Sequence, residues 1–107
     1  MYSKDAILAA TKSEAVKMIQ ENIDKSDKWL FRAVLAIFKF QTRDEQMGGI
    51  TKHNNGVGFN GLDARFFTLI ASELERMPDG SSLRTYEITS ARRRIKKYAG
   101  QLLALIG

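Results

Sequence analysis

The 107-residue sequence has no cysteine, a single histidine and a single proline. The absence of cysteine excludes disulfides, thiolate nucleophiles and cysteine-based zinc sites. With one histidine, neither a histidine-rich metal site nor a histidine-centred catalytic relay is expected within one chain. No apolar run approaches the roughly 18 residues of a membrane span, and the N-terminal stretch has no apolar signal core. We therefore expect a cytoplasmic protein that uses neither a cofactor nor a metal.

Alternating β-branched runs are also scarce, whereas apolar residues recur at helical spacing along most of the chain. The expected helices are 5–11 capped by Ser3, 14–23 capped by Ser13, 27–41 capped by Ser26 with a further turn from Thr42, 61–77 capped by Asn60, and a last helix from about Thr85. Residues 48–60 are too rich in glycine and asparagine for regular structure. The sequence predicts an all-α fold over residues 1–107: a compact single-domain bundle of four to five helices with one long loop.

Two of these helices have a well-defined expected inner face. In the helix over 61–77 it consists of Leu62, Phe66, Leu69, Ile70 and Leu74. In the last helix it consists of Ile88, Ala91, Ile95, Tyr98, Leu102 and Leu105. In the last helix the regular spacing of three and four residues predicts one continuous helix with one buried side.

Residues 56–61 read GVGFNG, which satisfies the nucleotide-binding pattern G-x-G-x-x-G. That pattern requires a buried strand before it and a second strand after the following helix, and neither is indicated here. An acid in the first turn of that helix also opposes an anion. We interpret the segment as a structural loop in which Phe59 packs in the core, Asn60 caps and Asp63 complements the helix dipole. The loop residues are Gly56, Gly58, Phe59, Asn60, Gly61 and Asp63.

The net charge of +5 comes from one segment. Residues 84–97 contain six of the 17 basic residues and one of the 12 acids, so the remaining 11 cations and 11 acids cancel. Within 92–97, five cations occupy six positions with no intervening acid, which favours an anionic partner such as a nucleic-acid phosphate backbone. The alternative is a solvated helix face with its cations near the helix C-terminus. The candidate nucleic-acid-binding residues are Arg92, Arg93, Arg94, Lys96, Lys97, Arg84, Lys52 and His53, with Tyr86 and Gln101 as further contacts.

Catalysis is not indicated. His53 has no serine or carboxylate partner at a spacing that the sequence can assert, so it is either an anion contact or an exposed histidine in a polar loop. No nucleophile elbow, metal signature or nuclease-type acid cluster occurs, and we expect the protein not to be an enzyme.

Residues 52–71 (KHNNGVGFNGLDARFFTLIA) and 91–105 (ARRRIKKYAGQLLAL) resemble a group of small helical proteins encoded by bacteriophages and prophages. That group shares an H-N-x-G-V-G-F-x-G-x-D-A-x-F loop and a closing K-Y-A-x-Q-L helix; QTRDEQ (41–46) is similar to the segment that precedes its loop. Residues 26–107 form the family-like core and 1–25 the variable N-terminal helices. One departure is Thr85-Tyr86, where Thr-Pro is expected. The resemblance implies phage origin and a bacterial host cytoplasm, but no activity and no catalytic residue.

Two functions therefore stay open. The first is a non-enzymatic phage accessory protein that binds DNA or RNA, largely independently of sequence, through the basic C-terminal helix. The second is a phage inhibitor of a host protein complex, of the anti-CRISPR or another anti-defence type, with residues 50–61 and a helix face as its interface. The oligomeric state is also open, because the apolar residues 102–106 suit either a core or a dimer contact.

Overall fold

The computed structural model describes the backbone of residues 1–48 and 58–106 and the side chains of 1–39 and 58–106. This part of the chain consists of helices and connecting segments, without a strand, and the predicted all-α single-domain fold is confirmed. Its elements are α1 (Lys4–Ala9), α2 (Lys12–Lys25), α3 (Asp27–Gly48), α4 (Gly61–Arg76), α5 (Thr85–Ile95), the 3₁₀-helix η1 (Lys96–Tyr98) and α6 (Ala99–Ile106).

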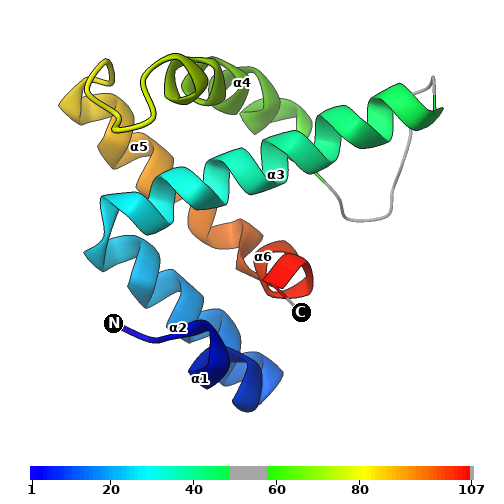
Figure 1. The fold of residues 1–107 in the computed structure, drawn as a ribbon, viewed down its shortest axis with the longest axis vertical. Coiled ribbons are helices and arrows are strands. Elements are labelled where there is room, and N and C mark those ends of the chain that lie inside the picture. Colours follow the sequence, from blue (N-terminus) through cyan, green and yellow to red (C-terminus); the bar gives the residue numbers. More distant parts are fainter. Residues whose placement is uncertain (49–57, 107) are drawn as a thin grey trace.

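Helix α3 lies at the centre of the molecule and packs against α2, α4, α5 and α6. In Figure 1 it crosses the middle, with α4 on one side and α2 and α6 on the other. The fully buried core side chains come from all sides of this arrangement: Ile7, Ile19, Ile23, Leu30, Val34, Ile37, Phe67, Ile70, Leu74 and Ile95. Burial of such side chains is the main force that stabilises the bundle.

The helix starts follow side-chain caps. Ser3, Ser26 and Asn60 each accept a hydrogen bond from the backbone N–H three residues later, as their positions in the sequence predict. The start of α2 was predicted wrongly: Thr11, not Ser13, is the cap, and its Oγ1 accepts from the Glu14 N–H at 3.2 Å. Both residues have a suitable hydroxyl, and capping at Thr11 gives α2 extra residues at its start.

Helix α3 continues to Gly48 without the separate turn expected from Thr42. No glycine or proline interrupts residues 41–47, so nothing in the local sequence ends the helix there.

The buried face of α4 differs from the predicted stripe. Leu62 is 90% exposed and Leu69 is 63% exposed, although both were assigned to the inner face. The buried residues are instead Asp63, Phe67, Ile70, Ala71 and Leu74. The helix has apolar residues on two sides, and periodicity alone did not distinguish the side that faces α3 and α5.

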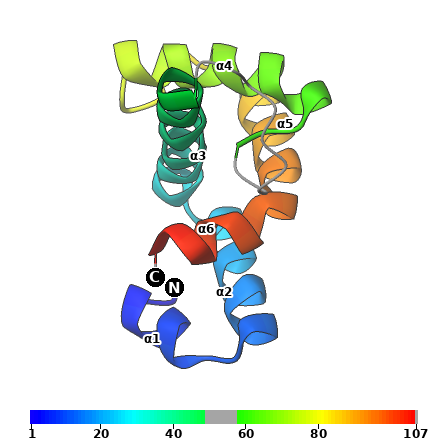
Figure 2. The same cartoon turned by 90° about the vertical axis from the view of Figure 1, so that its right-hand side faces the viewer.

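The last helix is broken into α5 and α6 by the 3₁₀ turn η1 at Lys96–Tyr98. Figure 2 shows that α6 runs in a different direction from α5. At the turn, the Lys96 carbonyl accepts the Ala99 N–H in the 3₁₀ pattern, and the Gln20 side-chain Nε2 donates to the same carbonyl at 3.0 Å. The predicted inner face holds through Leu102, whereas Leu105 is 38% exposed. The prediction of one continuous helix was wrong, because η1 interrupts it.

The turn between α4 and α5 depends on Gly80. Its φ of 76° lies in the left-handed region that favours glycine, and a methyl group at this position would overlap the ring of Phe31. The turn therefore closes tightly over α3 and fixes where α5 begins.

Candidate nucleic-acid interface

The described end of the glycine motif is anchored to α6. Gly58 has a φ of 89°, and the Gln101 side-chain amide binds both of its backbone groups. The Gly58 N–H donates to Oε1 at 2.9 Å, and Nε2 donates to the Gly58 carbonyl at 3.0 Å. This amide, which was considered for nucleic-acid contacts, is engaged within the chain. Lys52, His53 and Gly56 lie outside the described residues.

Phe59 fixes the same segment to the core. Its ring stacks on Phe67, with centroids 4.3 Å apart, and meets the edge of Tyr98 at 5.2 Å. The next residue, Asn60, caps α4 and donates its backbone N–H to the Tyr98 hydroxyl at 2.9 Å. The junction from 58 to 61 is thus a packed structural element.

Asp63 is the buried polar centre of this junction, with 3% of its surface exposed. Its Oδ2 accepts from the Tyr98 hydroxyl at 2.7 Å and lies 2.6 Å from the Lys97 Nζ. The Arg94 Nη1 lies 3.7 Å from Oδ1, and the Arg94 guanidinium covers the Phe66 ring at 4.5 Å. We name Asp63, Tyr98, Lys97 and Arg94 the Asp63 cluster. The sequence predicted only that Asp63 complements the dipole of α4, because its partners lie on α5 and η1, far away in the sequence.

The cluster shifts two pKa values in opposite directions. Burial alone would raise the pKa of Asp63, but hydrogen bonds from Lys97 and Tyr98 and the charges of Lys97 and Arg94 outweigh burial and lower it. Burial is also the largest cause that raises the pKa of Tyr98 to about 12, and the neighbouring Asp63 carboxylate adds to it. At neutral pH the cluster therefore consists of a carboxylate, a neutral phenol and two cations.

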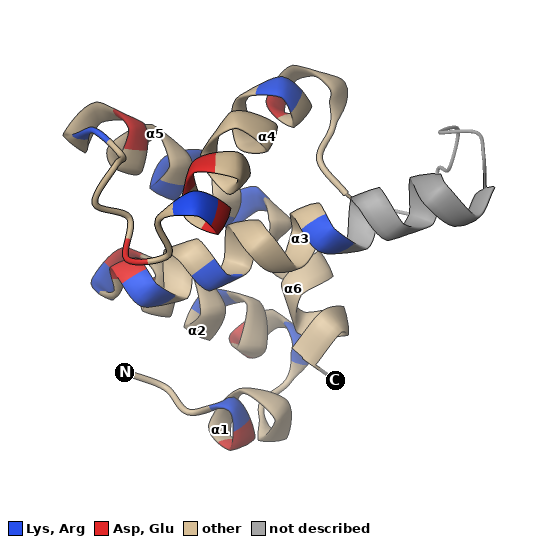
Figure 3. Ribbon diagram, turned by 45° about the horizontal axis from the view of Figure 1, so that its top comes forward, with Lys and Arg blue, Asp and Glu red and all other residues tan. Residues whose placement is uncertain are grey.

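Two further cations of the basic segment also have acid partners. The Arg92 Nη2 pairs with the Asp27 carboxylate, and its Nε donates to the Ile23 carbonyl at 2.8 Å. The Lys96 Nζ lies 2.9 Å from the Asp24 Oδ1. Figure 3 shows acidic and basic positions side by side around the start of α3. The expectation that these cations lack offsetting acids is wrong, because the acids come from α2, α3 and α4, far away in the sequence.

Arg84 and Arg93 differ from the other four cations. Both are exposed, and neither has an ion pair with any acid among the described side chains. Tyr86 is 66% exposed and lies two helical turns before Arg93, opposite the buried residues Ala91 and Ile95. With the exposed Thr89 between them, Tyr86 and Arg93 form the surface that we name the α5 outer face.

A groove of about 510 Å³ lies elsewhere, between the N-terminal segment, α3 and α6. Trp29, Ala33 and Leu102 contribute apolar surface, and Lys4 and Arg32 contribute cations. Within residues 1–39 and 58–106 there is no group of three histidine, cysteine or acidic side chains that could hold a metal. None of the helices described is both long and apolar enough to cross a bilayer.

Comparisons with protein-family models, with curated proteins and with solved structures find no match to this chain.

Proposed function

We propose that this protein is a non-enzymatic accessory protein, of the phage-encoded kind that it resembles, and that it binds nucleic acid through the α5 outer face. The observation that carries the proposal is Arg93: an exposed arginine, without an acid partner in the described structure, on the same helix face as an exposed tyrosine. A guanidinium binds phosphate through charge-assisted hydrogen bonds, and a tyrosine ring stacks on an unpaired base. This combination favours single-stranded DNA or RNA.

Binding is expected to be weak and independent of sequence. Phosphate contacts dominate such binding, and the ion pairs of Arg92, Arg94, Lys96 and Lys97 leave few cations free to make them. Arg84, at the start of α5, adds a second free cation. Tyr86 adds about 1–3 kcal/mol through stacking on one base. The sequence has no helix-turn-helix signature with a reader helix, so sequence preference is not part of the proposal.

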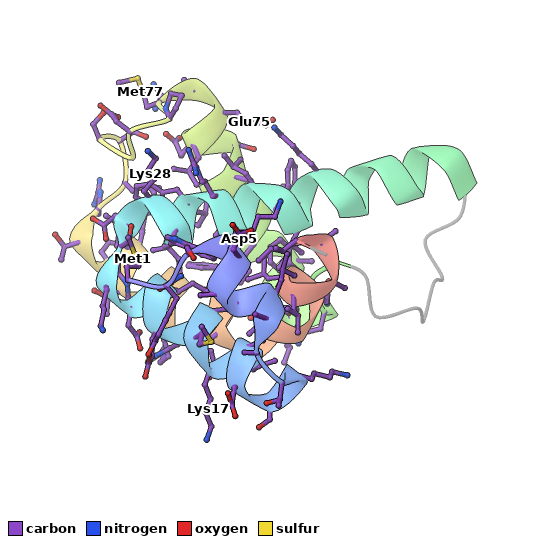
Figure 4. The ribbon with its side chains drawn as sticks, turned by 60° about the horizontal axis from the view of Figure 1, so that its bottom comes forward. Met1, Asp5, Lys17, Lys28, Glu75 and Met77 are labelled. Atoms are coloured by element: carbon purple, nitrogen blue, oxygen red, sulfur yellow. The ribbon has the colours of Figure 1, made fainter. Side chains whose placement is uncertain are left out.

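The test is a fluorescence anisotropy titration of labelled single-stranded and double-stranded oligonucleotides at about 50 and about 200 mM salt. We expect single strands to bind more tightly and Tyr86→Ala to weaken them by about tenfold, the loss of one stacked base. Arg93→Glu should weaken both kinds of strand. The matched control is Lys17→Glu, which makes the same charge change on an exposed residue of α2 that projects outward at the bottom of Figure 4.

Equal losses for Arg93→Glu and Lys17→Glu would mean that net charge, and not the α5 outer face, governs binding. If no oligonucleotide binds even at low salt, the proposal fails. The alternative of a host-complex inhibitor, which draws on residues 50–61, would then be tested by capture of a host protein from nuclease-treated lysate.

A further inference from the structure

The outer face of α4 exposes two leucines on the same side of the helix. Leu62 and Leu69 are separated by two helical turns, and both are exposed although most apolar side chains of their size are buried in this fold. They lie opposite the buried residues Phe67 and Ala71. Figure 2 shows α4 along an outer edge of the molecule, away from the other helices except on its inner side. An exposed apolar stripe on a surface helix is typical of an interaction site.

The charges on this stripe are arranged in a defined order. Arg65, one turn before Leu69, is exposed and has no acid partner among the described side chains. Glu73, one turn after Leu69, is partly exposed and lies 2.6 Å from Arg76. The N-terminal half of the stripe thus carries an unpaired cation, and the C-terminal half carries an acid that is paired with Arg76.

This order makes the stripe complementary to itself when it is reversed. If two copies of α4 pack antiparallel with Leu69 at the symmetry axis, Leu69 meets Leu69 of the second copy. Arg65 then faces Glu73 of the second copy, because the two residues are equally far from Leu69 on either side. Leu62 likewise faces Arg76, whose methylene groups can cover it. A two-fold axis repeats each contact, so both free arginines gain an acid.

We propose that two copies of this chain associate through the α4 outer face (Leu62, Arg65, Leu69, Glu73 and Arg76), with their α4 helices antiparallel. A parallel pairing would place Arg65 against Arg65 and Glu73 against Glu73, which is repulsive. One helix pair buries less surface than a standard interface, so the dimer should be weak, with a dissociation constant on the order of 100 µM. Met77, at the outer edge of the molecule in Figure 4, follows the C-terminal end of this face.

Sedimentation of the full chain over a range of concentrations tests the proposal. We expect a monomer–dimer equilibrium that Leu69→Asp abolishes, because it places two carboxylates at the axis. Leu69 is largely exposed, so this variant should keep its helical circular dichroism. A protein that stays monomeric at millimolar concentration would overturn the proposal, as would a dimer that Leu69→Asp leaves unchanged.

Charge reversal tests the register. Arg65→Glu alone and Glu73→Arg alone should each weaken association by about tenfold or more, because each leaves two like-charge contacts. An equimolar mixture of the two variants should restore it, since the new acid of one chain faces the new cation of the other and the native Arg65 faces the native Glu73. Failure of the mixture to associate would rule out this register.

The absence of cysteine allows a second test of orientation by single-cysteine oxidation. Leu69→Cys should form a disulfide-linked dimer readily. Leu62→Cys should not, because its two copies would lie about 20 Å apart at 1.5 Å per residue from the axis. Cross-linking of both variants at similar rates would contradict the antiparallel arrangement. The face is separate from the α5 outer face, so Leu69→Asp should leave nucleic-acid binding by the monomer unchanged, and failure of one proposal does not imply failure of the other.

Discussion

Arg93 and Arg94 are adjacent in the sequence, but the fold uses them differently. Arg94 reaches the buried Asp63 carboxylate at 3.7 Å and covers the Phe66 ring. Arg93 lies about 100° further around α5, is exposed to solvent and has no acid partner in the described structure. The comparison shows that the density of cations in a segment does not measure its binding surface. What decides is whether acids from other helices lie within reach of each cation.

The same division runs through the whole basic segment. Arg92, Arg94, Lys96 and Lys97 connect α5 and η1 to α2, α3 and α4 through ion pairs, and these cations help to hold the helices together. Arg84 and Arg93 have no such role. Substitutions at the structural cations and their partners should therefore change stability, whereas substitutions at the free cations should change binding. The largest expected effects concern the Asp63 cluster.

Asp63→Ala should have the largest effect. It leaves the Tyr98 hydroxyl without its acceptor and removes the carboxylate between Lys97 and Arg94. Because both cations are partly exposed, we expect a loss of about 2–4 kcal/mol in unfolding free energy, less than for a fully buried pair. Urea denaturation measures this loss. The variant should also bind single strands more tightly, because it frees the Lys97 and Arg94 cations. Unchanged stability and unchanged binding would contradict a structural role for the Asp63 cluster.

Acid should act through the same group. The folded pKa of Asp63 is lowered from its ordinary value of 3.8, so its contribution to stability is complete above that value. The contribution is lost as the pH falls through the folded pKa. The difference in unfolding free energy between the parent protein and Asp63→Asn should therefore be constant near neutral pH and shrink below pH 3.8. A difference that grows on acidification would have the wrong sign.

Tyr98→Phe should cost about 1–3 kcal/mol, because the Asn60 N–H loses its acceptor and the buried Asp63 loses a donor. The raised folded pKa of about 12 also implies that this stabilisation is complete below pH 10 and is lost as the pH rises toward 12. The ionisation of Tyr98 is measured as the phenolate absorbance that the parent protein has and Tyr98→Phe lacks. This ionisation step should lie well above pH 10.0. A step at the ordinary value would show that the phenol is not held by this cluster.

Gly58→Ala should have a smaller effect, about 1–2 kcal/mol, because alanine is strained at a φ of 89° and Gln101 holds the backbone in place. Gly61→Ala is the matched control. An added methyl group there meets no atom within 4 Å, so its stability should change little. Thermal melts of the two variants measure the difference, and a nucleotide added to the parent protein should leave its melting temperature unchanged. A large increase would instead indicate a phosphate site at this loop.

The sequence predicted most of the fold because its signals are local. The caps at Ser3, Ser26 and Asn60 each depend on residues within a few positions. The site was predicted less well, because its contacts are not local. Asp24, Asp27 and Asp63 reach cations from other helices, and no spacing within residues 84–97 indicates them.

Two further errors have the same origin. Leu62 and Leu69 fit a helical stripe as well as Phe67 and Ala71 do, and only packing against α3 and α5 selects the buried side. At the break at η1, Gln20 of α2 binds the Lys96 carbonyl from outside the segment, a contact that no spacing within residues 84–97 indicates. Exposure of Tyr86 also follows from the helix rotation, which places Ala91 and Ile95 inward.

The most direct test compares Arg93→Gln with Arg94→Gln, two substitutions that make the same change at adjacent positions. Affinity for a single-stranded oligonucleotide is measured at several salt concentrations, together with the unfolding free energy of each variant. We expect Arg93→Gln to weaken binding several-fold and to reduce the salt slope by about 0.7, the loss of one phosphate contact, with little change in stability. Arg94→Gln should lower stability and leave affinity within about twofold. Equal losses of affinity in both variants would contradict the division between free and structural cations.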